Sequence, residues 1–241
     1  MGRPRLLHRN QRLLHRTGGI YLLALALLLW ALNIPAALAA GPIVLDGQFL
    51  DWIGRASIND AIGDCAKPQL DVIDLLFATN PDDSTAYFMA ERLIGVNQPL
   101  GLRLYIDTNN NGSYTEPTDR LVTIRYAPNF ITAQVDVDIF TGTGAFLETI
   151  ASDANWGEGL VVGARRVEWG VSFADLGIVA GQPIRLYLES RPGSPSGGAT
   201  CDATAEVQWS PANALGLPLL ALVLCAGAIA MSRRKRGIRH G

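Results

Sequence analysis

One stretch of the chain carries oxygen-bearing side chains at the spacing of a calcium-binding loop. Asp107, Asn109 and Asn111 occupy the first, third and fifth positions of this stretch, and Gly112 follows them. Calcium is a hard cation that prefers oxygen ligands, and glycine permits the sharp turn that directs alternate side chains inward. The pattern therefore predicts a calcium site in the loop that begins at Asp107.

The closing ligand of this loop is not at its usual place. The twelfth position is Thr118, so Glu116 or Asp119 would have to supply the closing carboxylate. The same residues also fit an Asn-Gly hairpin whose polar side chains are solvated. The sequence leaves both interpretations open.

A second group of carboxylates consists of Asp60, Asp64, Asp71 and Asp74. Such a group can hold a cation, but acidic side chains near the end of a strand are most often solvated. We interpret this group as a solvated strand end.

Two aromatic residues lie in polar, glycine-containing segments, where no apolar neighbour in the sequence would cover them. These residues are Trp156 and Tyr114. Because aromatic faces stack on the C–H faces of pyranose rings, we expect both to act as sugar platforms, with Asp153, Asn155 and Glu158 as partners for sugar hydroxyls. The alternative is that each aromatic is a partly buried anchor of its loop.

The distribution of histidine excludes several catalytic classes. His8, His15 and His240 all lie near the ends of the chain. The region from 40 to 213 therefore has no imidazole for a Ser-His or Cys-His nucleophile, for a His-ligated zinc or for a His-ligated haem. An enzyme could use only a pair of carboxylates, for example Glu158 with Glu168 or Asp153, to cleave a glycoside. Since no pair stands out, we expect no enzymatic activity.

The charges are unevenly distributed along the chain. Ten of the 20 basic residues lie in the two ends, which leaves ten basic residues against all 22 acidic ones and a net charge of −12 in the middle. A nucleic-acid-binding surface needs clustered lysine and arginine. We therefore expect no nucleic-acid partner.

Both ends have the features of export and membrane segments. A basic stretch, an apolar run and the small residues 37–39 indicate a signal peptide over 1–39. Residues 211–231 are predicted to cross a membrane and 232–241 to form a basic cytoplasmic tail, with the 40–210 domain outside the cell. A bacterial sorting signal is the alternative for this tail, although Gly216–Leu220 lacks a sortase motif.

Cys65 and Cys201 are the two cysteines of the region expected to be exported, since Cys225 belongs to the apolar tail. An even pair of cysteines in an exported domain indicates a disulfide bond. The bond would close a long loop and fasten the end of the domain to its beginning.

Short segments of strand character, separated by turn residues, predict an all-β domain. We expect a two-sheet antiparallel β-sandwich of jelly-roll-like type, because strands at this spacing are typical of sandwiches. The only helical turn expected is 172–176, ending at Gly177. The predicted strands are 71–79, 85–92, 102–107, 121–126, 131–139, 146–151, 160–163, 166–173, 184–189 and 205–209.

Alternation within two of these strands predicts which side chains face the core. Every second residue from Ile131 to Ile139 is apolar, and the same period places Trp169 inward. Trp52 follows the Asp46-Gly47 turn, and we expect it to pack as a lid on the core rather than to serve as a sugar platform.

Several spaced motifs resemble those of known domains. The segments 45–52, 60–64 and 71–75, followed by 104–109, 167–172 and Leu176-Gly177, are similar to carbohydrate-binding module family 9 of the DOMON-like superfamily. The resemblance implies a β-sandwich that binds a sugar or haem, and the haem branch would need a histidine ligand that this region lacks.

Together these features predict a non-catalytic, carbohydrate-binding module anchored at the cell surface. Its partner would be an extracellular polysaccharide or a cell-wall glycan. A structural or adhesive surface domain without sugar specificity is the alternative, and a glycoside-active enzyme is less favoured.

Overall fold

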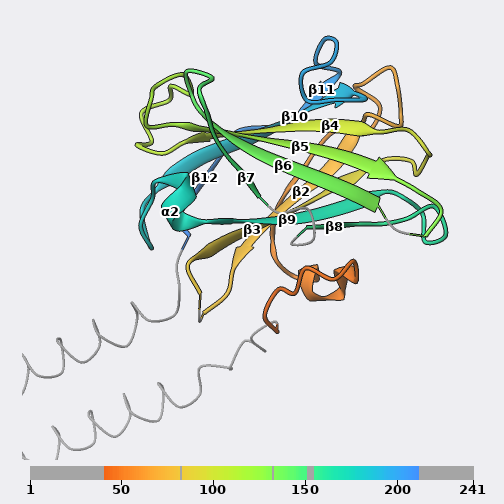
Figure 1. Cartoon of the computed structure of the whole chain (residues 1–241), viewed down its shortest axis with the longest axis horizontal. Helices are drawn as coiled ribbons and strands as arrows, with labels where there is room; N and C mark the ends of the chain where they lie inside the picture. The colour runs from red at the N-terminus through yellow and green to blue at the C-terminus, as the bar shows by residue number, and fades with distance from the viewer. Residues whose placement is uncertain (1–40, 82, 132, 151–154, 212–241) are drawn as a thin grey trace, which may run out of the picture. The chain divides into compact units, whose positions relative to one another are not determined.

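Two antiparallel sheets stack face to face in a computed structural model that describes residues 41–81, 83–131, 133–150 and 155–211 (Figure 1). The predicted β-sandwich is therefore confirmed, and its core lies between the two sheets. The predicted signal peptide, membrane segment and tail lie outside the described residues. Within the described ranges, no helix is long and apolar enough to cross a membrane.

The first sheet, sheet A, has five strands in the order β1-β2-β3-β9-β8. Between β3 and β9 the chain forms four strands of the other sheet and then β8, so strands far apart in the sequence become neighbours. The strands are β1 (Ala56–Asn59), β2 (Val72–Thr79), β3 (Thr85–Arg92), β8 (Trp156–Gly157) and β9 (Arg166–Ser172).

The second sheet, sheet B, has the order β11-β10-β4-β5-β6-β7, and β12 also pairs with β10. Strands β4 to β7 are joined by successive antiparallel connections, and β10 returns to the free edge of β4. The strands are β4 (Leu100–Asp107), β5 (Arg120–Pro128), β6 (Ala133–Thr141), β7 (Phe146–Ile150), β10 (Ile184–Pro192), β11 (Asp202–Ala203) and β12 (Val207–Trp209).

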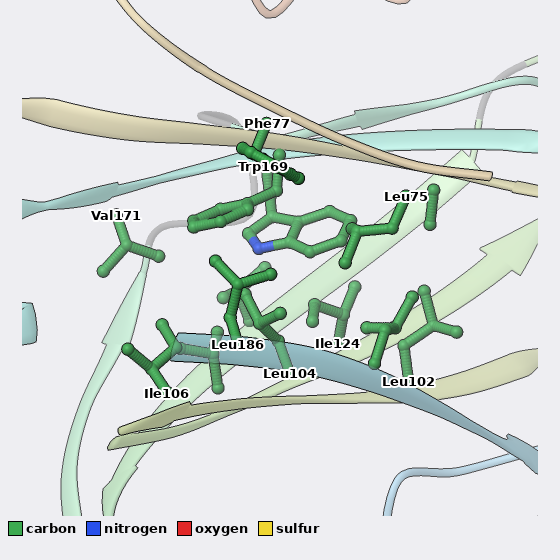
Figure 2. Close-up of a cluster of buried hydrophobic side chains, with 14 of the residues drawn as sticks. Leu75, Phe77, Leu102, Leu104, Ile106, Ile124, Trp169, Val171 and Leu186 are labelled. Carbon is green, nitrogen blue, oxygen red and sulfur yellow. The ribbon is translucent and has the colours of Figure 1, made fainter. Parts of the chain in front are cut away.

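Alternate residues of both sheets meet in the core (Figure 2). The indole of Trp169 lies between the sheets with Phe77 of sheet A on one side and Leu104 and Leu186 of sheet B on the other, as Figure 2 shows. Trp169 is fully buried and stacks on Phe88 with ring centroids 5.7 Å apart. The inward placement of Trp169 predicted from the period of two is confirmed.

The predicted helical turn is α2 (Phe173–Leu176). The hydroxyl of Ser172 accepts a hydrogen bond from the backbone N–H of Asp175, which caps the first turn. Gly177 ends the turn with a φ of 68°, a left-handed conformation that glycine adopts without steric cost.

A smaller apolar cluster lies on the outer face of sheet A. The 3-10 helix η1 (Phe49–Trp52) packs here against outward-facing residues of β2 and β3 such as Met89. The side chain of Trp52 is 1% exposed, and its indole N–H donates to Glu168 at 2.7 Å. Trp52 therefore packs as predicted, although it covers the outer face of a sheet rather than the end of the sandwich.

Three details of the strand prediction are wrong. Residues 160–163 form a turn, where the N–H of Leu160 bonds to Asn129 outside any strand. Ile131 is 77% exposed, because β6 begins only at Ala133. The short strands β1, β8 and β11 were not predicted.

The predicted disulfide between Cys65 and Cys201 is present, with the two Cα atoms 5.4 Å apart. Cys65 lies between β1 and β2 of sheet A, and Cys201 directly precedes β11 of sheet B. The bond therefore ties the two sheets together across 136 residues of sequence.

Candidate functional site

Trp156, the predicted platform, lies on the edge strand β8 and is 38% exposed. It pairs with Glu168 of β9, so its side chain is on the outer side of sheet A. The backbone of Gly47 packs against it, because a Cβ added at Gly47 would stand 3.8 Å from Trp156 Cε3. Part of the indole is thus covered by the segment before η1.

The predicted hydroxyl partners of Trp156 are buried. Asn155 is 3% exposed, and its side-chain oxygen accepts from the N–H of Gly170. Glu158 is also 3% exposed, forms an ion pair with Arg166 and accepts from the backbone N–H groups of Arg165 and Arg166. Both side chains therefore have structural partners, and Asp153 lies outside the described residues.

Tyr114 packs within a group of three tyrosines. Its ring stands edge-on to Tyr187 at a centroid distance of 4.9 Å and to Tyr105 at 6.5 Å. Its hydroxyl donates to Glu206 at 2.6 Å. Burial raises the pKa of the Tyr114 hydroxyl, and the hydrogen bond to Glu206 raises it further.

The two predicted platforms are not brought together. Tyr105 and Tyr187 project from β4 and β10 away from the core, so Tyr114 covers the outer face of sheet B. Trp156 lies on the outer side of sheet A. A single sugar chain in one site cannot contact both rings.

The predicted calcium loop is closed by its own hydrogen bonds. The side-chain N–H groups of Asn109 and Asn111 donate to Glu116 at 2.7 and 2.9 Å. Asp107 is fully buried, and its Oδ2 accepts from the N–H of Gly112 at 2.6 Å. Its Oδ1 has no hydrogen-bond partner within the described part of the chain.

The carboxylates of this loop are not gathered around one point. Asp119 is fully buried and accepts from the N–H groups of Thr108 and Glu116 at 3.2 and 2.9 Å. Over the ranges that the structure describes, one group of three carboxylates has oxygens within 4.8 Å of one another, and it lies elsewhere. This group consists of Asp60, Asp64 and Asp202.

A groove of about 420 Å³ runs over the outer face of sheet B. It was not predicted, because its floor depends on which strands are neighbours. Its lining combines two arginines, two aspartates, hydroxyls and apolar side chains: Arg103, Leu121, Thr123, Arg125, Asp136, Asp138, Phe140, Gly144, Ser194, Pro195 and Ser196.

The strand register sets the floor of this groove. Arg103 of β4 pairs with Thr123 of β5, which in turn pairs with Asp138 of β6. On one side of this row lies the pair Arg125 and Asp136, and on the other lies Leu121 with Phe140. Two polar rows therefore lie side by side across these strands, and one apolar row lies next to them.

One wall of the groove is the loop 193–196, which lies directly on Gly101. A Cβ added at Gly101 would stand 2.2 Å from the backbone carbon of Ser194 and 2.5 Å from the nitrogen of Pro195. Glycine is therefore required at this position, and the loop is held against β4.

The charged groups of the groove are weakly paired. Arg125 and Asp136 are 3.4 Å apart, with side chains 41% and 34% exposed. Exposed pairs of this kind contribute about 0–1 kcal/mol, so a ligand can exchange for them at small cost. Asp138, which also lines the groove, accepts from the hydroxyl of Thr149 at 2.6 Å through its Oδ1.

The carboxylate pair considered for an enzyme is embedded in the protein. Glu168 is fully buried and accepts from Trp52 and from the backbone N–H groups of Asp46 and Gly47. Burial raises the pKa of the Glu168 carboxyl. Because Glu158 is held by Arg166, both carboxylates have the partners expected of structural groups.

Comparisons of the chain with protein-family models, with curated proteins and with solved structures found no match.

Proposed function

We propose that the protein is a non-catalytic, glycan-binding module of the cell surface whose ligand lies in the groove on sheet B. The observation that carries this proposal is that charged rows lie beside an apolar row in one open groove. A pyranose ring presents hydroxyls at its edge and C–H groups on its faces. The polar row of Arg103, Thr123 and Asp138 matches the edge, and Leu121 with Phe140 matches a face.

Arginine and aspartate suit this task for a geometrical reason. A guanidinium group donates two parallel hydrogen bonds and a carboxylate accepts two, so each can hold neighbouring hydroxyls of one sugar. Because the groove is open and its contacts are few, we expect dissociation constants of about 1 µM to 1 mM.

The groove is a better candidate than Trp156. Ligand sites are concave and place several polar groups around one apolar surface. The indole of Trp156 is partly covered, and Asn155 and Glu158 beside it are buried. The resemblance to family 9 modules supports sugar binding as the function. It does not assign Trp156, Asn155 or Glu158 to the site.

Export and anchoring belong to the same proposal. They rest on the charge distribution, with basic residues at both ends of the chain and an acidic middle. Calcium in the loop from Asp107 to Asp119 is proposed as a stabilising ion, and the unpartnered buried Oδ1 of Asp107 supports it.

A glycan array tests the proposal. The full-length protein, purified in detergent, is applied in the presence of calcium as wild type, Asp138→Asn, Trp156→Ala and Glu148→Gln. Glu148→Gln is the control for Asp138→Asn. Glu148 is an exposed carboxylate on β7, so this variant removes the same charge outside the groove. We expect Asp138→Asn to lower binding at least tenfold and the other two variants to bind as the wild type.

The alternatives give different results. Loss of binding in Trp156→Ala alone would move the site to the edge of sheet A. Absence of binding to any glycan would favour a structural or adhesive domain, and release of reducing sugar would favour an enzyme.

A further inference from the structure

Three carboxylates from distant parts of the sequence meet at one edge of the sandwich. Asp60 and Asp64 lie in the segment between β1 and β2, and Asp202 begins β11 of the other sheet. One oxygen from each lies within 4.8 Å of the others. Like charges at this separation repel one another unless protons or a cation compensate them.

A fourth carboxylate, Asp71, is hydrogen-bonded to the turn between Asp60 and Asp64, and we call the four residues the aspartate cluster (Asp60, Asp64, Asp71 and Asp202). Asp71 is fully buried, and its Oδ2 accepts from the N–H of Gly63 at 2.8 Å. Gly63 belongs to the turn that carries Asp60 and Asp64, so the Asp71 carboxylate is held against that turn. Asp71 also interacts electrostatically with Asp60.

Two oxygens of the aspartate cluster are buried and unsatisfied. Asp71 Oδ1 and Asp60 Oδ2 have no hydrogen-bond partner within the described ranges. A buried carboxylate oxygen without a donor is destabilising by about 1–3 kcal/mol or more. A folded protein retains such groups where another ligand satisfies them, and a hard cation is a ligand that accepts oxygens from several carboxylates at once.

The fold fixes these carboxylates in place. Cys65 follows Asp64, Cys201 precedes Asp202, and the two cysteines form the disulfide bond. The Oδ2 of Asp202 also accepts from the N–H of Val72, the residue after Asp71, at 2.6 Å. The disulfide and this hydrogen bond therefore hold both sides of the cluster together without any ion.

We infer that the aspartate cluster is a calcium site that joins the two sheets beside the disulfide bond. Asp60, Asp64 and Asp202 supply the oxygens that already converge, and the buried Asp71 adds a negative charge that acts on Asp60. Calcium fits better than magnesium, because calcium accepts irregular sets of carboxylates whereas magnesium requires near-octahedral geometry. The site is separate from the groove and from the loop that begins at Asp107.

The interpretation of the acidic residues as a solvated strand end is wrong for Asp71, which is fully buried, whereas Asp64 is exposed. Asp74, which the sequence grouped with them, instead accepts a hydrogen bond from Asn59 on the neighbouring strand. Asp202 joins the aspartate cluster only because the fold brings β11 close to the segment between β1 and β2. No local sequence pattern reveals this proximity.

Calcium titration of the full-length protein, purified in detergent and stripped with EGTA, tests the site. The variant is Asp64→Asn, because Asp64 is exposed and its substitution leaves the core intact. The matched control is Asp74→Asn, which removes the same charge nearby but outside the cluster. Calorimetry with calcium chloride should show one binding event weakened at least tenfold in Asp64→Asn and unchanged in Asp74→Asn.

Melting temperatures provide a second test, because the effect of Asp64→Asn should have opposite signs in EGTA and in calcium. In EGTA, Asp64→Asn should melt above the wild type because it relieves repulsion, and in calcium it should melt below the wild type because it loses a ligand. The inference is overturned if the wild type binds no calcium, if Asp64→Asn and wild type give the same isotherm, or if the variant melts lower by the same amount in both conditions.

Discussion

Removal of the disulfide bond should have a large and calculable effect on stability. The bond closes a loop with a sequence separation of 136 residues. In the chain-entropy relation, a loop of this length corresponds to a stabilisation of about 5 kcal/mol at 25 °C. A domain is stable by only about 5–15 kcal/mol in total, so the oxidised and reduced proteins should differ clearly.

The measurement is urea unfolding of Cys65→Ala/Cys201→Ala against the oxidised protein, both in a Cys225→Ala background that removes the third cysteine of the sequence. With a slope of about 2 kcal/mol/M, the midpoint should fall by about 2.5 M. The reduced form of the control protein should unfold near the double variant, which separates loss of the bond from loss of the side chains.

Both proteins should be compared in EGTA, so that calcium does not contribute to the difference. Equal midpoints for the oxidised protein and the double variant would refute the reasoning. A decrease in the slope alone would indicate instead a change in the surface exposed on unfolding.

Four further results are expected. The double cysteine variant should bind calcium more weakly at the aspartate cluster, as calorimetry can measure. By thermodynamic reciprocity, calcium should shift the thiol–disulfide equilibrium of the wild-type bond towards the oxidised form, which the thiol content at equilibrium in a redox buffer measures. Glu168→Ala should lower the free energy of unfolding by about 3 kcal/mol, measured in urea, since it leaves the N–H groups of Trp52, Asp46 and Gly47 without an acceptor. Gly101→Val should displace the loop 193–196, lower glycan binding and speed proteolysis there, while far-UV circular dichroism stays that of the wild type. Glu116→Gln should reduce the rise in melting temperature caused by calcium if the loop from Asp107 binds the ion, and an unchanged rise would leave the hairpin interpretation.

The period of two along the chain was sufficient to predict most of the sandwich. Val135, Val137 and Ile139 alternate with polar residues, and all three are fully buried. The same period failed at Ile131. The alternating pattern includes this residue, but the pairing of β6 with β5 begins only at Ala133. Hydrophobic alternation indicates which side of a strand is buried, but pairing with a neighbour decides where the strand ends.

The shortest strands could not be predicted for a related reason. β8 and β11 have two residues each, too few for any periodicity. They exist because β9 and β10 offer free edges to the chain that passes beside them. Their formation is thus a consequence of the tertiary structure rather than of local propensity.

The same distinction between local pattern and tertiary structure applies to the predicted site residues. The aromatic residues of polar segments and the resemblance to family 9 modules led to the prediction of a sugar ligand, and the spacing of oxygen-bearing side chains led to the prediction of calcium. It could not indicate which aromatics are accessible: Tyr114 carries polar neighbours in the sequence, yet it packs on Tyr105 and Tyr187 from other strands. The groove was missed because Arg103, Thr123 and Asp138 become one row only when β4, β5 and β6 are neighbours.

The disulfide bond and the proposed calcium ion act on the same edge of the sandwich, where the aspartate cluster lies. Sheet A and sheet B share a core, but the strands β1 and β11 at this edge are short and contribute few backbone hydrogen bonds. A covalent bond between Cys65 and Cys201 limits how far the edges can separate, and it places Asp64 and Asp202 within reach of one ion. Without a cation the same proximity is repulsive, so the bond that assembles the site also makes an empty site destabilising. A domain with a net charge of −12 would then gain stability where calcium is abundant, and its edge would loosen where calcium is removed.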